Sequence, residues 1–421
     1  MKILNFAPKS KNGSRGPLSP AFPRKKIVAV IPTYKTSATT LTFIHSIRKY
    51  HPQITVVIVN DCIPSGSSFY YNFRKIQKLS RTDPGIICLK TPTNLLKAGA
   101  LNYGINYVMR MQPRPHVIFT SDDDVIINDQ TLPKMVNELY SRKRIGAVCS
   151  QSLVNNKNTN LLTRLQALEY QGFTATKIAD KYFLQGPLVM QGMLTAFRTA
   201  AMNTVKGFTP YHLIEDYDIT VRLKRKAWRS SIALTAQSWT DVPEDIPTLW
   251  RQRVRWGYGG IQVVTANFGY ISTVFQDLIG HGLFLALVAL IISSWIFLSP
   301  NPANHQLIFG IIIVTAIHFT LSQLLNLAVL LSFREKDRLD WFLKLSLIPE
   351  FVYSNLISFV VLGCYLYFLY NQTLGFLAKK ITALNRIYNF GLHLFKHLGY
   401  STTWGTRVLI NPAYAERRLS I

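Results

Sequence analysis

Three long runs with almost no charged residues constrain the fold of this chain more than any other feature. They cover residues 273–298, 307–333 and 345–370. Each exceeds the roughly 20 residues that a helix needs to cross a bilayer. As core helices of a soluble domain they would overfill its interior, so the pattern predicts a helical transmembrane region over 273–370 with about three spans.

The charges of the connecting loops predict how this region is oriented. Residues 299–306 carry no charge, whereas 334–344 carry four basic side chains. Because basic loops stay on the cytoplasmic side, we expect a multi-pass protein of the cytoplasmic (inner or plasma) membrane whose N-terminal domain faces the cytoplasm. A third complete crossing would put the basic tail 371–421 outside. Either the third run doubles back or lies at the interface, or the charge rule fails here. We favour a cytoplasmic tail, with an amphipathic helix over 381–398.

The N-terminal part divides into a tail and an α/β domain. Residues 1–26 are rich in Pro, Ser and Gly and carry seven basic and no acidic side chains. They predict a flexible tail without a signal peptide, either near anionic lipids or without a partner. From 27 to 245, short β-branched runs alternate with helical spacing, which predicts a right-handed βαβ sheet with its ligand crevice at the carboxyl ends of the strands. We expect strands at 27–31, 54–59, 86–89, 117–120 and 147–149, and helices at 39–50, 97–110 and 132–142.

The net charge raises the question of nucleic acid. The chain has 47 Lys and Arg against 21 Asp and Glu, a formal net charge of +26, and four cysteines. The basic residues are scattered over the tails, the loops and an amphipathic segment at 246–272, without a nucleic-acid-binding module. We therefore expect a lipid bilayer as a partner and no nucleic acid. The few cysteines, none in a C-x-x-C pair, fit a reducing compartment.

Carboxylates follow two predicted strands. Ser121 and then Asp122, Asp123 and Asp124 come directly after 117–120. Asp122 and Asp124, two residues apart, can point to one side and offer oxygen ligands to Mg²⁺ or Mn²⁺ shared with a diphosphate. The alternative is a solvated acidic turn. Asp61 follows 54–59 and is by itself more typical of a helix cap or a turn.

Three other segments allow two interpretations each. Lys97 opens a predicted helix, as an anion site or as an ordinary helix start. Glu215 and Asp216 precede a helix, where they can cap it or where Asp216 can act as a general base. The segment 252–256 (QRVRW), with its tryptophan and arginines, fits membrane anchoring, and it also fits binding of a diphosphate and a sugar ring.

Taken together, these segments resemble the processive, membrane-embedded family 2 glycosyltransferases, the group of cellulose, chitin and hyaluronan synthases. The resemblance covers about residues 25–260. In the order of the family, the matching parts are Pro32-Thr33-Tyr34, Asp61, Lys97 with the following AGALN, Asp122-x-Asp124, Glu215-Asp216 and Gln252-x-x-Arg255-Trp256. The 239–244 segment also resembles the family's segment before its Q-x-x-R-W, and the match around Gly192 is looser.

The resemblance implies a GT-A (Rossmann-like) catalytic domain over 27–245 that uses a nucleotide-diphosphate sugar, most often a UDP-sugar, and a divalent metal. It implies that Asp216 is the base of an inverting transfer and that Asp122 and Asp124 hold the metal-bound diphosphate. By the same similarity, Pro32, Tyr34, Asp61 and Lys97 would bind the nucleotide sugar, and Gly192, Glu215, Gln252, Arg255 and Trp256 would bind the diphosphate or the acceptor.

Two activities follow from this resemblance. The first is synthesis of a polysaccharide or oligosaccharide at the cytoplasmic membrane face. The second is transfer of a single sugar to a lipid carrier or lipid headgroup, which would make a glycolipid. Two departures bear on the choice: Lys35-Thr36 stands where the family usually has Asn-Glu, and spans are expected only after the catalytic domain. A complete polymer channel from one chain is therefore not expected, and export of a polymer would require further subunits.

Overall fold

A computed structural model describes residues 25–182, 185–210, 213–270, 335–346 and 348–400, together with single positions between 289 and 333. The predicted tail at 1–26 (apart from Lys25 and Lys26), most of the spans 273–298 and 307–333 and the C-terminal residues 401–421 lie outside the described residues.

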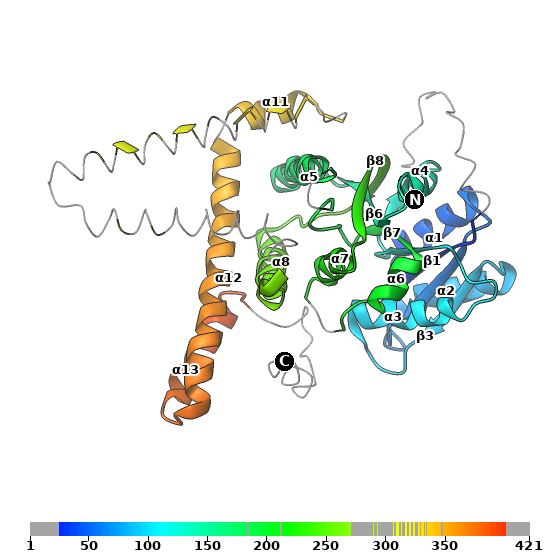
Figure 1. Cartoon of the computed structure of the whole chain (residues 1–421), viewed down its shortest axis with the longest axis horizontal. Helices are drawn as coiled ribbons and strands as arrows, with labels where there is room; N and C mark the ends of the chain where they lie inside the picture. The colour runs from blue at the N-terminus through cyan, green and yellow to red at the C-terminus, as the bar shows by residue number, and fades with distance from the viewer. Residues whose placement is uncertain are drawn as a thin grey trace.

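The described strands form one mixed sheet in the order β3-β2-β1-β4-β7-β6-β8-β5 (Figure 1). The strands are β1 (Ile27–Thr33), β2 (Thr55–Asn60), β3 (Ile86–Lys90), β4 (Val117–Ser121), β5 (Ile126–Ile127), β6 (Ile145–Val154), β7 (Leu194–Arg198) and β8 (Arg229–Thr240). The five predicted strands are confirmed, and β1 to β4 pair in parallel as expected. A wholly parallel sheet is wrong, because β7 pairs antiparallel with both β4 and β6. Its sequence LTAFR lacks the β-branched run that marked the other strands.

Helices cover both faces of the sheet because β1 and β2 are apolar on both sides. Ile27, Ala29 and Ile31 of β1 face α1 (Ala38–Tyr50), α2 (Ser68–Thr82) and α4 (Thr131–Tyr140). The alternate residues Val28 and Val30 face α3 (Leu96–Met109), α6 (Thr199–Val205) and α7 (Glu215–Arg225). Successive strand side chains point to opposite faces, so each face of the sheet has its own buried core.

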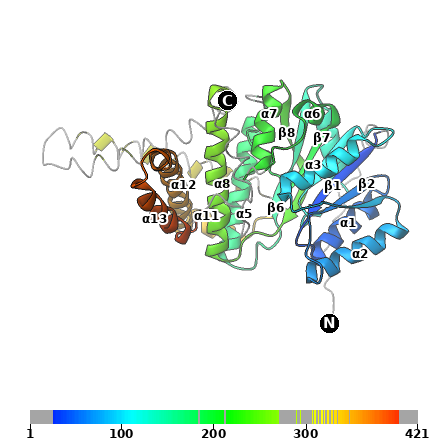
Figure 2. The same cartoon turned by 90° about the horizontal axis from the view of Figure 1, so that it is seen from below.

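Two further helices lie between the sheet and the C-terminal part of the chain. These are α5 (Leu161–Asp180) and α8 (Ile246–Ala266), and Figure 2 shows both on the side of the sheet that faces α12. Asp245 caps the start of α8 by accepting a hydrogen bond from the Thr248 N–H, and Pro247 occupies its first turn. Proline is tolerated there because that N–H has no partner within the helix.

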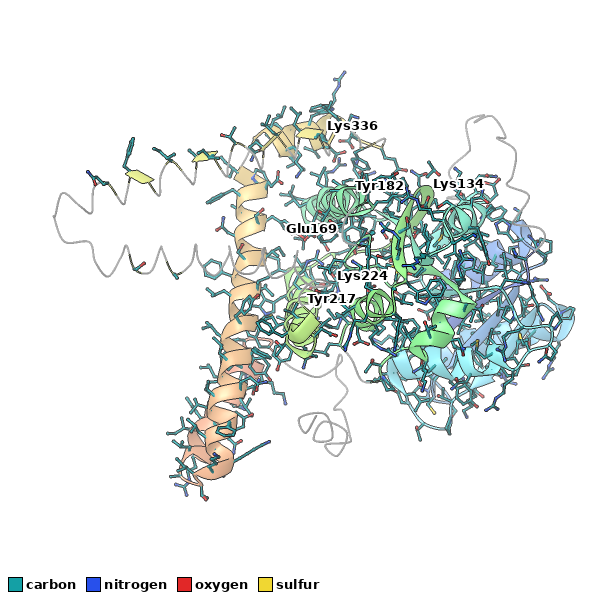
Figure 3. All side chains as sticks on the ribbon, viewed as in Figure 1. Lys134, Glu169, Tyr182, Tyr217, Lys224 and Lys336 are labelled. Atoms are coloured by element: carbon teal, nitrogen blue, oxygen red, sulfur yellow. The ribbon has the colours of Figure 1, made fainter. Side chains whose placement is uncertain are left out.

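The C-terminal part consists of α11 (Arg338–Leu345), α12 (Ile348–Lys380) and α13 (Leu384–His397). Of the residues that the structure describes, only α12 forms a helix long and apolar enough to cross a membrane, so the predicted multi-span region is not confirmed. α12 packs on α8 through a shared cluster that includes Val254, Tyr258, Val360 and Cys364. Side chains project from α12 along its whole length in Figure 3.

A reversal within the third apolar run is wrong. α12 runs continuously past Glu350 and Asn355, since Lys344 pairs with Glu350 and the Asn355 side chain donates to the Phe351 carbonyl at 2.8 Å. The chain turns back only after Lys380. The predicted amphipathic helix at 381–398 is confirmed as α13, which returns along α12 and stacks Tyr388 on Tyr370 with ring centroids 5.8 Å apart.

Candidate active site

A cavity of about 710 Å³ opens where β4 and β8 end and where α3 and α7 begin. Segments that are distant in the sequence meet there, including α5, α8 and Val361 of α12. Nine of the twelve predicted site residues line it: Lys97, Asp122, Asp124, Gly192, Glu215, Asp216, Gln252, Arg255 and Trp256. Pro32, Tyr34 and Asp61 are not part of its lining.

Lys97 connects two of the predicted acidic segments. Its Nζ lies 2.5 Å from Asp122 Oδ1 and 2.8 Å from Glu215 Oε1. Burial by itself would lower the pKa of Lys97, but the carboxylates of Asp122, Glu215 and Asp216 outweigh it and raise this pKa above its usual value. In return, Lys97 and Arg255 overcome the effect of burial on Glu215 and hold its pKa below the usual range. Lys97 is therefore a fixed cation whose charge protein carboxylates already balance.

Asp61 positions the loop that carries Lys97. Its buried carboxylate accepts hydrogen bonds from the Leu95 N–H at 2.7 Å and from the Thr91 hydroxyl at 3.1 Å. Its backbone carbonyl accepts another from the Asn94 side chain. The observed contacts thus make Asp61 an anchor of the turn before α3, and the predicted contact of Asp61 with a nucleotide stays a prediction.

The end of β1 supports the acidic turn. Pro32 lies within β1, paired with Val59 of β2, and Tyr34 follows the strand. Between them, the Thr33 hydroxyl donates to Asp123 Oδ2 at 2.5 Å. The middle carboxylate of the turn is thereby directed at β1, while its two neighbours line the cavity.

Asp122 and Asp124 form the part of the acidic turn that can receive a cation. The Asp122 N–H donates to the Met193 carbonyl at 3.0 Å, which fixes the turn against the segment before β7. Enclosure of the turn, with the negative charges of Asp122 and Asp123, raises the pKa of Asp124 to about 7. Within the described part of the chain, no three or more His, Cys, Asp or Glu side chains gather to hold a metal ion. The turn therefore fits an ion that takes two protein carboxylates and completes its shell with substrate oxygens and water.

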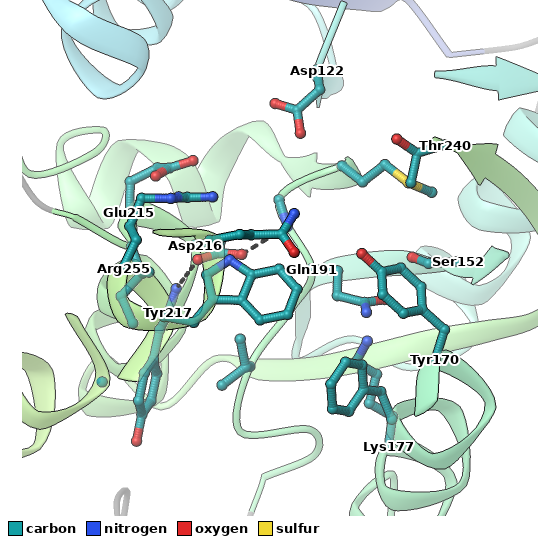
Figure 4. A pocket seen from close by; sticks show the side chains of 18 of the residues that line it. Asp122, Ser152, Tyr170, Lys177, Gln191, Glu215, Asp216, Tyr217, Thr240 and Arg255 are labelled. Carbon is teal, nitrogen blue, oxygen red and sulfur yellow. Dashed lines mark hydrogen bonds between the residues drawn. The ribbon is translucent and has the colours of Figure 1, made fainter. Parts of the chain in front are cut away.

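Two backbone N–H groups hold the carboxylate of Asp216 in the cavity. It lies in the first turn of α7, where its Oδ2 accepts from the Gly192 N–H at 2.8 Å and its Oδ1 accepts from the Tyr217 N–H at 2.9 Å (Figure 4). Burial, reinforced by the charge of Glu215, raises its pKa to about 6. A Cβ atom at position 192 would lie 3.2 Å from Asp216 Oδ2 and 3.1 Å from Lys97 Nζ, so a glycine there permits this approach.

The α8 residues divide between the cavity and the protein interior. Gln252, Arg255 and Trp256 line the cavity, and the Arg255 guanidinium donates to the Leu213 carbonyl at 3.3 Å. Arg253 is buried, and its guanidinium lies 4.1 Å from the centre of the Trp256 ring. The same guanidinium pairs with Glu169 of α5.

Glu169 connects this arrangement to α12. Its carboxylate also accepts a hydrogen bond from the Tyr353 hydroxyl at 2.7 Å, and Figure 3 labels Glu169 on α5. The tryptophan of the QxxRW segment is therefore held by contacts inside the protein, which favours the sugar-binding interpretation of Trp256 over membrane anchoring.

Sequence reasoning missed the contribution of α5 and of the strand ends beside it. Tyr170, Phe173 and Lys177 line the cavity from α5, together with Ser152 of β6 and Gln191 before β7. Their spacing at 170, 173 and 177 is that of one helix face. Helical spacing over 161–180 is the sequence signal that could have revealed this face.

Comparisons with known proteins identify the family. Residues 116–371, more than half of the chain, match the family described as glycosyl transferase family group 2. The chain belongs to this family. Its mixed sheet is accordingly the GT-A type of glycosyltransferase fold, and this glycosyltransferase carries its DxD, Asp216 and QxxRW segments on one cavity.

The relatives of this glycosyltransferase align with about half of its residues. It is 27% identical over 220 residues to the poly-beta-1,6-N-acetyl-D-glucosamine synthase of Staphylococcus epidermidis. The aligned residues make up 52% of this chain and 50% of that synthase. The synthase of the same name from Staphylococcus aureus is 26% identical over 213 residues, 51% of this chain and 49% of that protein. The chain thus spans about half the length of the curated relatives it matches.

A solved structure is also similar to it. The mannosyltransferase PcManGT from Pyrobaculum calidifontis, in complex with GDP-Man and Mn²⁺, has a TM-score of 0.49 and 16% identity, covering 76% of this chain and 89% of that chain.

Proposed function

We propose that this glycosyltransferase moves a sugar, with inversion, from a nucleotide-diphosphate sugar to a growing polysaccharide or oligosaccharide at the cytoplasmic face of the membrane. The observation that carries the proposal is the placement of Asp216. Its carboxylate is fixed by the Gly192 N–H in the cavity that also holds the Lys97–Asp122 pair and Trp256. A proton acceptor, a diphosphate-binding end and a flat aromatic face thus share one space.

The donor would bind at the end of the cavity formed by Asp122 and Asp124. A Mg²⁺ or Mn²⁺ ion held there by the two carboxylates would neutralise charge on the leaving diphosphate. Arg255 lies on the same cavity, where its guanidinium is suited to phosphate oxygens. Support for polymer synthesis comes from the two synthases that resemble this chain, whose names specify poly-N-acetylglucosamine products. A UDP-sugar as the donor is what the family resemblance implies.

The acceptor would lie on Trp256 with one hydroxyl directed at Asp216. In the transfer step the hydroxyl oxygen forms a bond to the anomeric carbon while the bond from that carbon to the diphosphate oxygen breaks. The electron pair of the broken bond leaves with the diphosphate, and the hydroxyl proton goes to Asp216. Attack from the face opposite the leaving group inverts the anomeric centre, and a pKa of about 6 leaves Asp216 deprotonated at neutral pH.

The test is transfer by membranes that contain the full chain, measured with a panel of radiolabelled UDP- and GDP-sugars and Mn²⁺, followed by sizing of the product. We expect one donor class to react, and Asp216→Asn to lower the rate at least 100-fold, as general base catalysis contributes about 10²–10⁴. The matched control is Asp129→Asn, an exposed carboxylate outside the cavity lining, which should transfer normally. Unchanged transfer by Asp216→Asn would refute the assigned base, and products that carry a single added sugar would replace polymer synthesis by single transfer.

A further inference from the structure

Lys177 is a buried cation in the cavity that the proposed reaction does not use. It lies near the C-terminal end of α5 and lines the same cavity as Asp216. Its exposed fraction is only 7%. In Figure 4 the labelled Lys177 lies across Gln191 from Asp122, on the side where Tyr170 and Ser152 also point inward.

The charge of Lys177 has no direct protein counterpart among the described residues. Neither a hydrogen bond nor an ion pair within 4.0 Å joins its ammonium group to any described side chain or carbonyl. The electrostatic influences on it come from Cys149 and from Asp216. Burial outweighs both and lowers the pKa of Lys177 below its usual value. Lys97 contrasts with it, since two carboxylates within 2.8 Å already balance that cation.

The neighbouring charges on α5 do not neutralise Lys177 either. Asp180, three residues further along the helix, also lines the cavity. Its charge acts on Lys224 of α7, where it offsets part of the lowering of the Lys224 pKa by burial. Lys181 forms an ion pair with Glu138 at 3.0 Å. An ammonium group that is removed from bulk water without a paired carboxylate is costly, and a ligand anion would recover much of that cost.

We propose that Lys177 is an anion-binding point on the acceptor side of the cavity, so that the preferred acceptor carries a carboxylate or a phosphate group. This inference rests on the proposed function, because it assigns Lys177 to the acceptor half of the same reaction. Two sources share this chemistry. One is a uronic acid residue at the end of a saccharide, and the other is a phosphate on a sugar or on a lipid carrier.

The position of Lys177 supports the acceptor rather than the donor. The diphosphate of the donor has its own partners at the opposite end of the cavity, where Asp122, Lys97 and Arg255 gather. Tyr170 and Phe173, on the same face of α5 as Lys177, supply aromatic surface of the kind that packs against sugar rings. If a sugar lies against these rings, an anionic substituent on it would point into the part of the cavity that Lys177 lines.

The experiment compares three acceptors: a glucose-terminated disaccharide, its glucuronate-terminated counterpart and its 6-phosphate. Each is tested with four proteins, namely the wild type, Lys177→Gln, Lys177→Arg and Lys181→Gln. Lys181→Gln is the matched control, since it removes one positive charge a helical turn away and outside the cavity lining. We expect the wild type to use one charged acceptor about tenfold or more better than the neutral one in kcat/KM, the size of a hydrogen bond to a charged group. Lys177→Gln should lose that preference, and Lys177→Arg should retain most of it.

The two charged acceptors distinguish the sources of the anion, because only the preferred one should lose kcat/KM in Lys177→Gln. Binding of the same three saccharides is followed by titration calorimetry, which requires no transfer. If no sugar nucleotide supports transfer, the proposed function fails, while weaker binding of the charged saccharide to Lys177→Gln would still support the anion site. Equal use and equal binding of charged and neutral saccharides by the wild type, or an unaltered preference in Lys177→Gln, would overturn it.

Thermal unfolding separates this role from a structural one. Lys177→Gln removes a buried charge that has no direct partner in the described structure, so we expect its Tm to equal or exceed that of the wild type. A large fall in Tm would assign Lys177 to the stability of α5 and would overturn the proposal.

Discussion

Replacement of Lys97 by methionine tests whether this residue balances the charge of Glu215. The Lys97 Nζ lies 2.8 Å from Glu215 Oε1, and the two side chains are 18% and 4% exposed. At that distance and an effective dielectric constant of about 20, the gross attraction is roughly 6 kcal/mol. Removal of one partner of a buried pair costs about 3–5 kcal/mol, because the remaining charge stays buried without its counterpart. We expect a loss near the lower end of that range, since Arg255 continues to favour the ionised Glu215.

The assay is thermal unfolding of the purified full chain in detergent at pH 7.5. A loss of about 3 kcal/mol corresponds to a fall in Tm of roughly 6–12 °C for a domain of this size class. The double variant Lys97→Met with Glu215→Gln should recover part of this loss, because position 215 then carries no buried charge, while Asp122 still lacks its cation. The matched control is Lys75→Met, which removes an exposed lysine of α2 and should leave Tm unchanged.

The pH dependence of the single variant gives a second check. Lys97 is the main cause that holds the pKa of Glu215 below its usual range, and without it burial acts in the opposite direction. The folded variant would then bind a proton more tightly than the unfolded chain, so its stability deficit should shrink as the pH falls. A single variant as stable as the wild type, or a double variant no more stable than the single one, would refute the assigned charge balance.

Three further predictions concern activity. Gly192→Ala should lower kcat at least tenfold with little change in Tm, because the alanine Cβ would lie 3.2 Å from Asp216 Oδ2 and would displace that carboxylate. Steady-state kinetics measure kcat and a melting curve measures Tm, and a fully active variant would contradict the role of this close contact. Since Asp216 must be ionised to accept a proton and its pKa is about 6, kcat/KM should fall about tenfold per pH unit below pH 6 and level off above pH 7; a flat profile from pH 5 to pH 8 would exclude Asp216 as the titrating base. Arg253→Gln removes the cation 4.1 Å from the Trp256 ring and should raise KM for the acceptor about fivefold while KM for the donor stays constant; an equal rise in both constants would show that Arg253 acts on the whole fold.

Much of the catalytic fold was predictable from the sequence because its signals are local. The buried β-branched runs of β1 and β2 and the acidic turn after β4 are each specified by neighbouring residues. The antiparallel direction of β7 was not predictable, because it depends on the end of the sheet at which the preceding segment enters the strand. Tertiary contacts fix that position, such as the hydrogen bond between the Asp122 N–H and the Met193 carbonyl.

The candidate site divides in the same way. Asp216 and Asp122 lie in short motifs, so both could be proposed from the sequence and both line the cavity. Lys177 was missed because it belongs to no motif and enters the cavity only through the packing of α5 against the sheet. Asp61 was selected by its position after a strand, but its observed hydrogen bonds go to the loop before α3.

The inverted direction of β7 has a consequence for how this enzyme can diversify. Because β7 runs against β4 and β6, it begins at the sheet edge where they end, so the segment just before it supplies Gln191 and Gly192 to the cavity. Behind this segment, the strand itself is held on both sides by its neighbours. Substitutions and length changes between α5 and Met190, which leave Gly192 and its contact with Asp216 in place, can therefore reshape the proposed acceptor half of the cavity while the sheet keeps its register. A library confined to that segment is the economical route to an altered acceptor range.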